Sequence, residues 1–190
     1  MGLLDGRVVI VTGAGGGIGR AHALAFAAED ARVVVNDIGV GLDGSPAGGG
    51  SAAQGVVDEI VAAGGEAVTS GANVADWGQA EGLIQTAVEN FGGLDILVNN
   101  AGIVRDRMFA NTSEEEFDAV TAVHLKGHFA TMKHAGAYWR AKSKAGDTVE
   151  ARIINTSSGA GLQGSVGQAN YSASKAGIAA LTLVAAAEMG

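Results

Sequence analysis

Tyr171 and Lys175 stand four residues apart in the stretch NYSASK. Positions i and i+4 share one face of a helix, so this spacing can hold a phenol and an ammonium group side by side. A free tyrosine titrates near ~10, and a neighbouring cation favours the phenolate. Such a pair could exchange protons near neutral pH. Because YxxxK is a short pattern that also arises by chance, the rest of the chain must decide whether this pair does chemistry.

A glycine-rich stretch, VTGAGGGIGR at residues 11–20, follows a short β-branched run and precedes a helix-like segment. Glycines allow a tight turn and a close approach of the backbone to a phosphate, and a helix N-terminus favours an anion. Asp37 ends the next strand-like run, where a carboxylate can accept hydrogen bonds from a ribose diol and would repel a 2′-phosphate. Lys and Arg are absent from residues 13–19. We therefore predict a dinucleotide site that prefers NAD to NADP, against the alternative that the glycines serve packing alone.

The composition excludes several classes of protein. The 190 residues carry a net charge of −8, which argues against nucleic acid as a partner, and they include no cysteine, which excludes disulfides and cysteine-ligated metals. No apolar run reaches the ~18 residues of a membrane-spanning helix. The first residues show no basic segment before an apolar core, so we expect no secretory signal, no membrane partner and a cytoplasmic location.

The elements that must position these residues alternate between strand-like and helix-like patterns. This alternation predicts a parallel sheet covered by helices on both faces, and right-handed crossovers make the sheet doubly wound. We therefore predict a three-layer α/β/α fold of the Rossmann type, as a single domain over residues 1–190. The expected strands are residues 7–12, 32–37, 66–74, 94–99 and 151–157.

Helix starts are indicated by capping residues. Asp76 can cap one helix, and Ser113 with Glu116 forms a capping box for a long helix that reaches about residue 140. The other expected helices are residues 17–28, a segment around residues 56–61 and one from about residue 170 to the end. The expected loops are residues 38–51, 141–147 and 159–167, the last of them mobile.

The motifs and their order resemble the short-chain dehydrogenase/reductase family over nearly the whole chain. The family's serine lies thirteen positions before the tyrosine, which selects Ser158 over the neighbouring Ser157. The glycine run also fits TGxxGxxG through Gly16, the pattern of the longer epimerase-like branch, but NNAG favours the single-domain dehydrogenase branch. The motifs are TGxxxGxG on Thr12, Gly13, Gly17, Ile18 and Gly19, NNAG on residues 99–102, the serine on Ser158, and YxxxK on Tyr171 and Lys175.

Four longer stretches resemble one subgroup of this family. VVVNDIG, NNAGIVRDRMFA, VHLKGHF and GQANYSASKAG are similar to the (R)-3-hydroxyacyl-CoA dehydrogenase unit of peroxisomal multifunctional enzymes, and to actinobacterial relatives that act on steroid or acyl-CoA alcohols. The resemblance implies an oxidoreductase that transfers a hydride between NAD and a secondary alcohol or ketone. It implies a 3-hydroxyacyl-CoA or a steroid-derived CoA thioester as substrate, and a homo-oligomer, tetramer or dimer, built through two long helices. We expect no peroxisomal C-terminal tripeptide.

The resemblance also implies a role for each matching residue. Tyr171 would be the general base in oxidation and the general acid in reduction, and Lys175 would favour its phenolate and bind the nicotinamide ribose. Ser158 would donate a hydrogen bond to the substrate oxygen and stabilise the charge that develops there. The implied cofactor contacts are Gly13, Gly17, Ile18, Gly19, Asp37, Asn73, Val74, Asn99, Ala101, Gly102, Tyr171 and Lys175.

Two features depart from the family pattern. The catalytic tetrad of the family has an asparagine in the long helix where this chain has His124, as the peroxisomal subgroup does. His124 is either a proton-relay member in place of that asparagine or a helix histidine whose ring is satisfied by backbone. His124 and His128 are also four apart, but no HExxH glutamate accompanies them, so we predict no metal site. The family usually continues with a substrate loop and two more strands, so the domain over residues 1–190 is expected to be C-terminally incomplete.

Two other functions stay open. One is the oxidation of a free hydroxysteroid or another secondary alcohol. The other is a nucleotide-binding scaffold without turnover, whose signal would be the loss of Tyr171 or Lys175, and both residues are present. Arg105 and Arg107 could contact the phosphates of CoA, or they could be ordinary solvated charges.

Overall fold

Among the described residues, five parallel strands form one sheet in the order β3-β2-β1-β4-β5. The computed structural model describes residues 2–45 and 51–190. Each strand lies within the residues where the sequence predicts it. The strands are β1 Val8–Thr12, β2 Arg32–Asn36, β3 Glu66–Ser70, β4 Ile96–Asn99 and β5 Arg152–Asn155.

Strand β3 ends four residues before the predicted end at residue 74. The side-chain amide of Asn36 donates to the carbonyl oxygens of Ser70 and Ala72, at 3.1 and 2.9 Å. The Ser70 oxygen also accepts from the backbone N–H of Asp37 at 3.0 Å, and beyond it the Asn36 side chain, not a backbone group, binds Ala72. The Asn73 side chain then accepts a hydrogen bond from the backbone N–H of Ala75, as Asn does in a turn.

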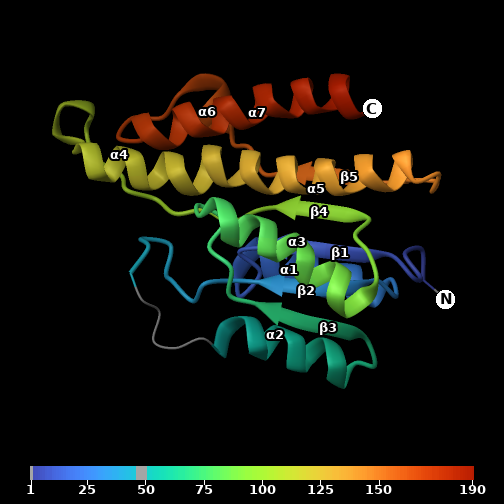
Figure 1. The fold of residues 1–190 in the computed structure, drawn as a ribbon. Coiled ribbons are helices and arrows are strands. Elements are labelled where there is room, and N and C mark those ends of the chain that lie inside the picture. The colour runs from blue at the N-terminus through green and yellow to red at the C-terminus, as the bar shows by residue number, and fades with distance from the viewer. Residues whose placement is uncertain (1, 46–50) are drawn as a thin grey trace.

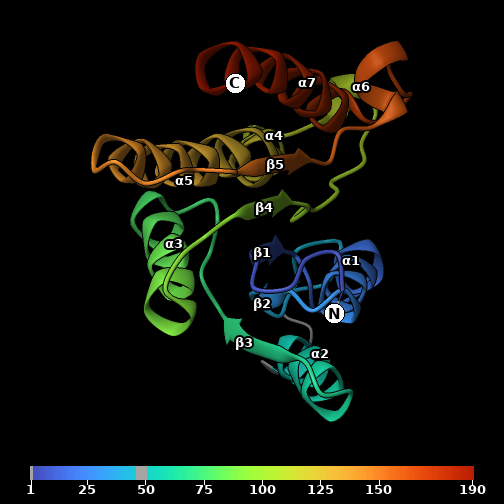
Figure 2. The ribbon, with the colours of Figure 1, turned by 90° about the vertical axis from the view of Figure 1, so that its right-hand side faces the viewer.

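Helices cover both faces of the sheet, as Figures 1 and 2 show. Helices α1, Gly17–Ala28, and α2, Ser51–Ala62, lie on one face. Helices α3, Trp77–Phe91, and α5, Gly127–Lys144, lie on the other. Helix α7, Ala169–Met189, runs beside α5. The prediction of a three-layer, Rossmann-type α/β/α fold is confirmed.

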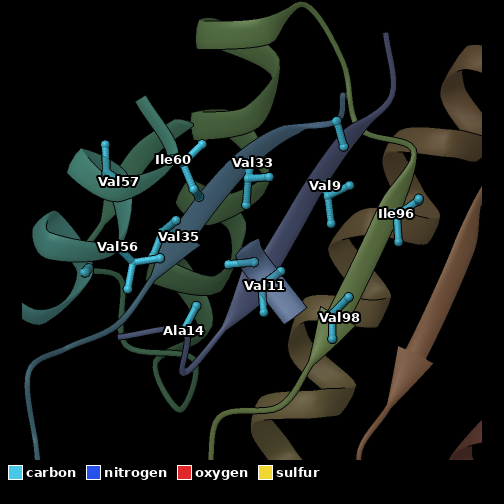
Figure 3. Packing of buried hydrophobic residues seen from close by; sticks show 13 residues of the cluster. Val9, Val11, Ala14, Val33, Val35, Val56, Val57, Ile60, Ile96 and Val98 are labelled. Carbon is cyan, nitrogen blue, oxygen red and sulfur yellow. The ribbon is translucent and has the colours of Figure 1, made fainter. Parts of the chain in front are cut away.

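Strand β1 is the centre of two apolar cores because all of its five side chains are buried. Successive side chains of a strand point to opposite faces. Val9 and Val11 therefore pack against α1 and α2, in the cluster of Figure 3, whereas Val8 and Ile10 pack against α3 and α5. Full burial of such a side chain stabilises the fold by about 1.5–3 kcal/mol. A continuous β-branched run gains this energy on both faces only as a central strand, as predicted.

The long helix predicted from Ser113 is interrupted. Its capping box is present, and α4 spans Glu114–Thr121. A π-helical turn follows at Ala122–Lys126, before α5 begins at Gly127. Single π-helical turns inside α-helices are rare and often lie at functional sites.

Two of the predicted loops are partly helical. Helix α5 continues to Lys144, so residues 141–144 are not the expected solvated loop. Lysines near a helix C-terminus interact favourably with the helix dipole, and Lys142 also pairs with Asp147 at 2.8 Å. Residues 159–163 form a short helix, α6, Gly159–Gln163, whose N-cap is Ser158. A 3₁₀ turn, η1, spans Phe109–Asn111.

The loop predicted at residues 38–51 falls partly outside the described residues, because 46–50 are not described. Its first part, up to Ser45, is an irregular segment, and α2 already begins at Ser51. Among the described helices, none is long and apolar enough to cross a membrane.

Candidate active site

A cavity of about 590 Å³ lies at the carboxyl ends of the strands. In an open parallel sheet this is the edge where ligands bind, next to the point where the strand order reverses, here between β1 and β4. Three of the predicted site residues, Gly19, Asn99 and Ser158, are not among its lining residues. The predicted site residues that line it are Gly13, Gly17, Ile18, Asp37, Asn73, Val74, Ala101, Gly102, His124, Tyr171 and Lys175.

The glycine loop between β1 and α1 is shaped by positive φ angles and by close backbone approach. Gly13 has φ 62° and Gly17 has φ 52°, a region that side-chain-bearing residues rarely adopt. A Cβ on Gly13 would come within 2.8 Å of the Cα of Ala101. A Cβ on Gly19 would collide with the carbonyl oxygen of Gly13. Gly19 therefore serves the packing of α1 beneath the loop.

The N-terminus of α1 suits a bound phosphate. Its N-cap is Gly16, and no side chain of the described residues caps it. The first N–H groups of a helix lack partners within the helix and carry a partial positive charge. A Cβ on Gly16 or Gly17 would meet no atom of the described residues within 4 Å, so the backbone faces open space. These residues fit the pyrophosphate of a dinucleotide, which local donors must hold because the net charge of −8 repels anions.

Asp37 follows β2 and lines the same cavity. Its carboxylate accepts hydrogen bonds from the backbone N–H groups of Gly15, at 2.9 Å, and Gly39, at 2.7 Å. A Cβ on Gly15 would come within 2.9 Å of this carboxylate. The glycine loop and the end of β2 are thus joined through one negative charge beside the cavity.

Asn100 and Thr12 join β1 to the segment after β4. The Asn100 amide donates to the carbonyl oxygens of Thr12 and Gly13, at 3.0 and 3.2 Å. The Thr12 hydroxyl accepts from the backbone N–H groups of Asn100 and Ala101, at 2.9 and 3.0 Å. Asn100 lines the cavity. Thr12 and Asn100 lie within the TGxxxGxG and NNAG motifs, but the motifs alone do not predict this connection.

Asn99 faces away from the cavity, into a buried polar chain. Its amide donates to the Asn155 side chain at 3.0 Å, and its oxygen accepts from the Thr131 hydroxyl at 2.7 Å. These bonds connect the ends of β4 and β5 to α5. Adjacent residues of a strand end point to opposite sides, so only the second asparagine of NNAG meets the cavity.

Tyr171 and Lys175 lie side by side on α7, with the Lys175 Nζ 5.5 Å from the centre of the Tyr171 ring. Lys175 is 2% exposed, and its Nζ donates to the Thr156 carbonyl oxygen at 2.6 Å. Burial lowers the pKa of Lys175 from 10.5 to about 8, so most of the lysine stays protonated at neutral pH. The arrangement therefore holds a cation next to a phenol at the cavity edge.

The two serines before α6 have different partners. The Ser157 hydroxyl donates to the backbone carbonyl of Lys175 at 2.8 Å, which ties the end of β5 to α7. The Ser158 hydroxyl accepts from the backbone N–H of Ala160 at 3.2 Å and caps α6. A hydroxyl that accepts one hydrogen bond can still donate its own proton.

His124 lies in the π-helical turn, and its ring packs edge-on against the ring of Tyr171, with centres 5.2 Å apart. Its Nε2 lies 2.7 Å from the carbonyl oxygen and 3.1 Å from the nitrogen of Ile103, so backbone satisfies this side of the ring. Its Nδ1 is buried and has no hydrogen-bond partner among the described residues. A Cβ on Gly102 would collide with the ring, so glycine is what lets His124 come this close.

His128, one turn further, is also buried, and its Nε2 has no partner in the described part of the chain. Burial is the main cause that lowers the pKa of His124 from 6.5 to about 4 and of His128 from 6.5 to about 3. Both rings are therefore neutral at pH 7. The described residues contain no group of three His, Asp or Glu side chains placed to hold a metal ion.

The two buried, neutral histidines make the free energy of unfolding depend on pH. Their folded pKa values of about 4 and about 3 lie below the 6.5 of an unfolded histidine, so the unfolded chain binds more protons below pH 6.5. The contribution of the two histidines to the free energy of unfolding is therefore fully present above about pH 6.5. It is lost as the pH falls from there toward their folded pKa values. His128→Phe should remove about 2 kcal/mol of the loss between pH 7 and pH 5. Urea unfolding at both pH values measures this, and an unchanged difference between them would contradict it.

A comparison with protein families matches residues 7–190 to the model described as short chain dehydrogenase. The chain belongs to the short-chain dehydrogenase family. This confirms the family resemblance of the sequence motifs.

Proteins similar to this chain include two curated enzymes and one protein of known structure. Hydroxyacyl-CoA dehydrogenase ChsB1 of Mycobacterium tuberculosis is 53% identical over 193 residues, which cover 98% of this chain and 58% of that protein. Peroxisomal multifunctional enzyme type 2 of Mus musculus is 48% identical over 177 residues, which cover 93% and 23%. The crystal structure of a short chain dehydrogenase from Mycobacterium avium has a TM-score of 0.94 at 86% identity, covering 100% of this chain and 65% of that one. The chain thus spans less than two thirds of the length of each of these relatives.

Proposed function

We propose that this chain carries the cofactor site and the catalytic residues of an NAD-dependent dehydrogenase that oxidises the secondary alcohol of a 3-hydroxyacyl-CoA or a steroid-derived CoA thioester. The observation that carries the proposal is the buried Lys175 beside Tyr171, at the edge of a cavity that also contains the glycine loop. The printed name of the relative from Mycobacterium tuberculosis, a hydroxyacyl-CoA dehydrogenase, supports the substrate class.

Each group has a defined task in this proposal. A nicotinamide held by these residues would supply the hydride chemistry, in either direction. Tyr171 takes the proton of the alcohol and returns it in the reverse direction. The ammonium of Lys175 stabilises the phenolate, and Ser158 donates a hydrogen bond to the substrate oxygen. His124 holds the backbone at Ile103, which leads into the site, and packs against the Tyr171 ring.

The preference for NAD over NADP rests on Asp37. Its carboxylate lies beside the cavity and is held in place by two backbone N–H groups. A 2′-phosphate placed near this carboxylate would be repelled, whereas a ribose diol would donate hydrogen bonds to it.

Replacing Asp37 by alanine should reduce the ratio of NAD to NADP affinity by about tenfold, which corresponds to ~1.4 kcal/mol. Dissociation constants for both cofactors, measured by fluorescence titration, give this ratio. An equal loss of affinity for both cofactors would instead mean that Asp37 only supports the glycine loop.

The residues considered as contacts of the CoA phosphates are Arg105 and Arg107. Arg107 pairs with Glu116 at 3.2 Å, so its charge is partly compensated. Arg105 lies against the loop at Gly44, where a Cβ would come within 2.9 Å of its guanidinium. The second candidate, a free hydroxysteroid or another secondary alcohol, needs no phosphate contacts and uses the same Tyr171 and Lys175.

The deciding experiment is NADH formation by the complete natural protein with (R)- and (S)-3-hydroxyacyl-CoA and with the matching free acids. Turnover of one CoA enantiomer alone would support the reaction, the cofactor and the need for the thioester. Turnover of a hydroxysteroid but of no CoA substrate would favour the second candidate. NAD binding without any turnover would favour a nucleotide-binding scaffold.

A homo-oligomer, as a dimer or tetramer, is part of the same proposal. Helices α5 and α7 lie side by side and expose large apolar side chains, Phe129 on α5 and Leu183 and Val184 on α7. Exposed apolar surface of this kind commonly marks an interface. A cytoplasmic location stays a prediction, since the similar proteins include peroxisomal enzymes.

A further inference from the structure

Asn170 is a buried amide that none of the roles above uses. It is the second residue of α7, directly before Tyr171, and it is 1% exposed. Burial of an amide is unfavourable unless its donors and acceptor are all paired. The partners of Asn170 therefore show what its burial achieves.

Three hydrogen bonds satisfy the Asn170 side chain. Its Oδ1 accepts from the backbone N–H of Tyr171 at 2.7 Å. Its Nδ2 donates to the carbonyl oxygens of Arg105 and Glu116, both at 3.3 Å. Two acceptors on one side and one donor on the other determine which way the amide faces.

The N–H of Tyr171 needs such a partner because it lies in the first turn of α7, where backbone donors have no acceptor within the helix. The N-cap residue, Gln168, makes no capping bond with its side chain. Its amide instead donates to the carboxylate of Asp106, at 3.2 and 3.1 Å. Asn170 thus supplies the capping oxygen at Tyr171 itself.

The other two bonds reach the two backbone segments that hold His124. Arg105 lies two residues after Ile103, whose backbone binds the His124 ring. Glu116 belongs to α4, which leads into the π-helical turn that contains His124. The start of α7 lies against α4 in this region (Figure 1). The Asn170 side chain therefore connects the backbone of Tyr171 to the two backbone segments that hold the His124 ring. That ring in turn packs against Tyr171.

We propose that Asn170 is a positioning residue, which sets the place of the Tyr171 hydroxyl relative to His124 and Lys175 through these three hydrogen bonds. The proposal rests on the role proposed for Tyr171. The position of Tyr171 matters because a general base that is misplaced by about 1 Å can lose about a hundredfold in rate. If Asn170 only stabilised the fold, its loss would lower stability without changing the place of the Tyr171 ring.

Two nearly isosteric variants separate these possibilities. Asn170→Asp keeps the acceptor for the Tyr171 N–H but, when ionised, loses both donors. Asn170→Leu loses all three bonds. Ile60→Val is the control, because Ile60 is buried on α2 and the substitution costs about 0.5–1.5 kcal/mol, comparable to a lost hydrogen bond.

Two measurements are made on the complete natural protein. The first is steady-state kinetics against pH, with kcat and KM for NAD separated. The second is the fluorine NMR spectrum of protein labelled with fluorotyrosine. Tyr171→Phe and Tyr138→Phe each remove one signal and so assign the signals of these two tyrosines, and this measurement does not depend on turnover.

Both variants should lower kcat by about tenfold to a hundredfold, while KM for NAD changes less than about twofold. The kcat of Asn170→Asp divided by the kcat of the wild type should rise as the pH falls, because the protonated carboxyl group of Asp can donate one of the two lost hydrogen bonds. The fluorine signal of Tyr171 should move in both variants and that of Tyr138 should not. Ile60→Val should change neither kcat nor the Tyr171 signal.

An unmoved Tyr171 signal in both variants would overturn the proposal, as would a loss of kcat that Ile60→Val reproduces. Absence of turnover in the wild type would count against the proposed function instead. The fluorine spectra would still decide in that case whether Asn170 positions Tyr171.

Discussion

Tyr171→Phe is expected to lower kcat by at least about a hundredfold, since a positioned general acid or base contributes about 10²–10⁴ in rate. The substitution removes only the hydroxyl and leaves the ring that packs against His124. NAD binding should therefore stay within about twofold of the wild type, because the glycine loop and Asp37 are untouched. Initial rates of NADH formation and a fluorescence titration with NAD measure the two effects.

Tyr138→Phe is the matched control for this experiment, because Tyr138 lies on α5 and is absent from the residues that line the cavity. Its turnover should equal that of the wild type. Near-normal turnover in Tyr171→Phe would refute the assignment of Tyr171 as the general base. Loss of NAD binding together with turnover would instead mean that the hydroxyl supports the cofactor site.

Gly19→Ala is expected to have the second large effect. The new Cβ would collide with the carbonyl oxygen of Gly13, which is backbone and cannot rotate away. Overpacking of this kind costs about 1–3 kcal/mol, and relief of the clash must shift the glycine loop. We therefore expect a lower free energy of unfolding and weaker NAD binding, measured by urea unfolding and by titration.

Gly82→Ala provides the comparison, because Gly82 lies within α3 and a Cβ there would meet no described atom within 4 Å. That variant should gain about 0.5–1 kcal/mol, since alanine favours a helix more than glycine does. If Gly19→Ala behaved like Gly82→Ala, close packing of α1 against the glycine loop would not be the reason for glycine at position 19.

Local signals predicted most elements well because the local and the tertiary forces agree there. The β-branched run at residues 7–12 becomes β1, which is buried on both faces. Asp76 accepts a hydrogen bond from the backbone N–H of Gln79 at 2.8 Å and caps α3, and the Ser113 and Glu116 capping box starts α4 as predicted. Caps depend on residues within one turn, so a sequence reveals them.

The predicted elements differ from the observed ones where contacts between residues distant in the sequence compete with local preference. The π-helical turn interrupts a segment with good helical periodicity, at the place where the His124 ring meets the backbone of Ile103. Strand β3 ends early where Asn36, on a neighbouring strand, binds two carbonyl oxygens. Neither contact leaves a signal within one turn of the segment it alters.

The amino-acid sequence by itself determined most strands and helices and the positions of the glycine loop, Asp37, Tyr171 and Lys175, because these depend on periodicity and on short spacings. It determined the family through the order of the motifs along the chain. Only the tertiary structure decided that Asn100 rather than Asn99 meets the cavity, that His124 packs against Tyr171, and that Asn170 is buried between three segments. These depend on which way a side chain points after strands and helices have packed. That direction follows from contacts across about 20 to 65 residues of chain, which no local pattern encodes.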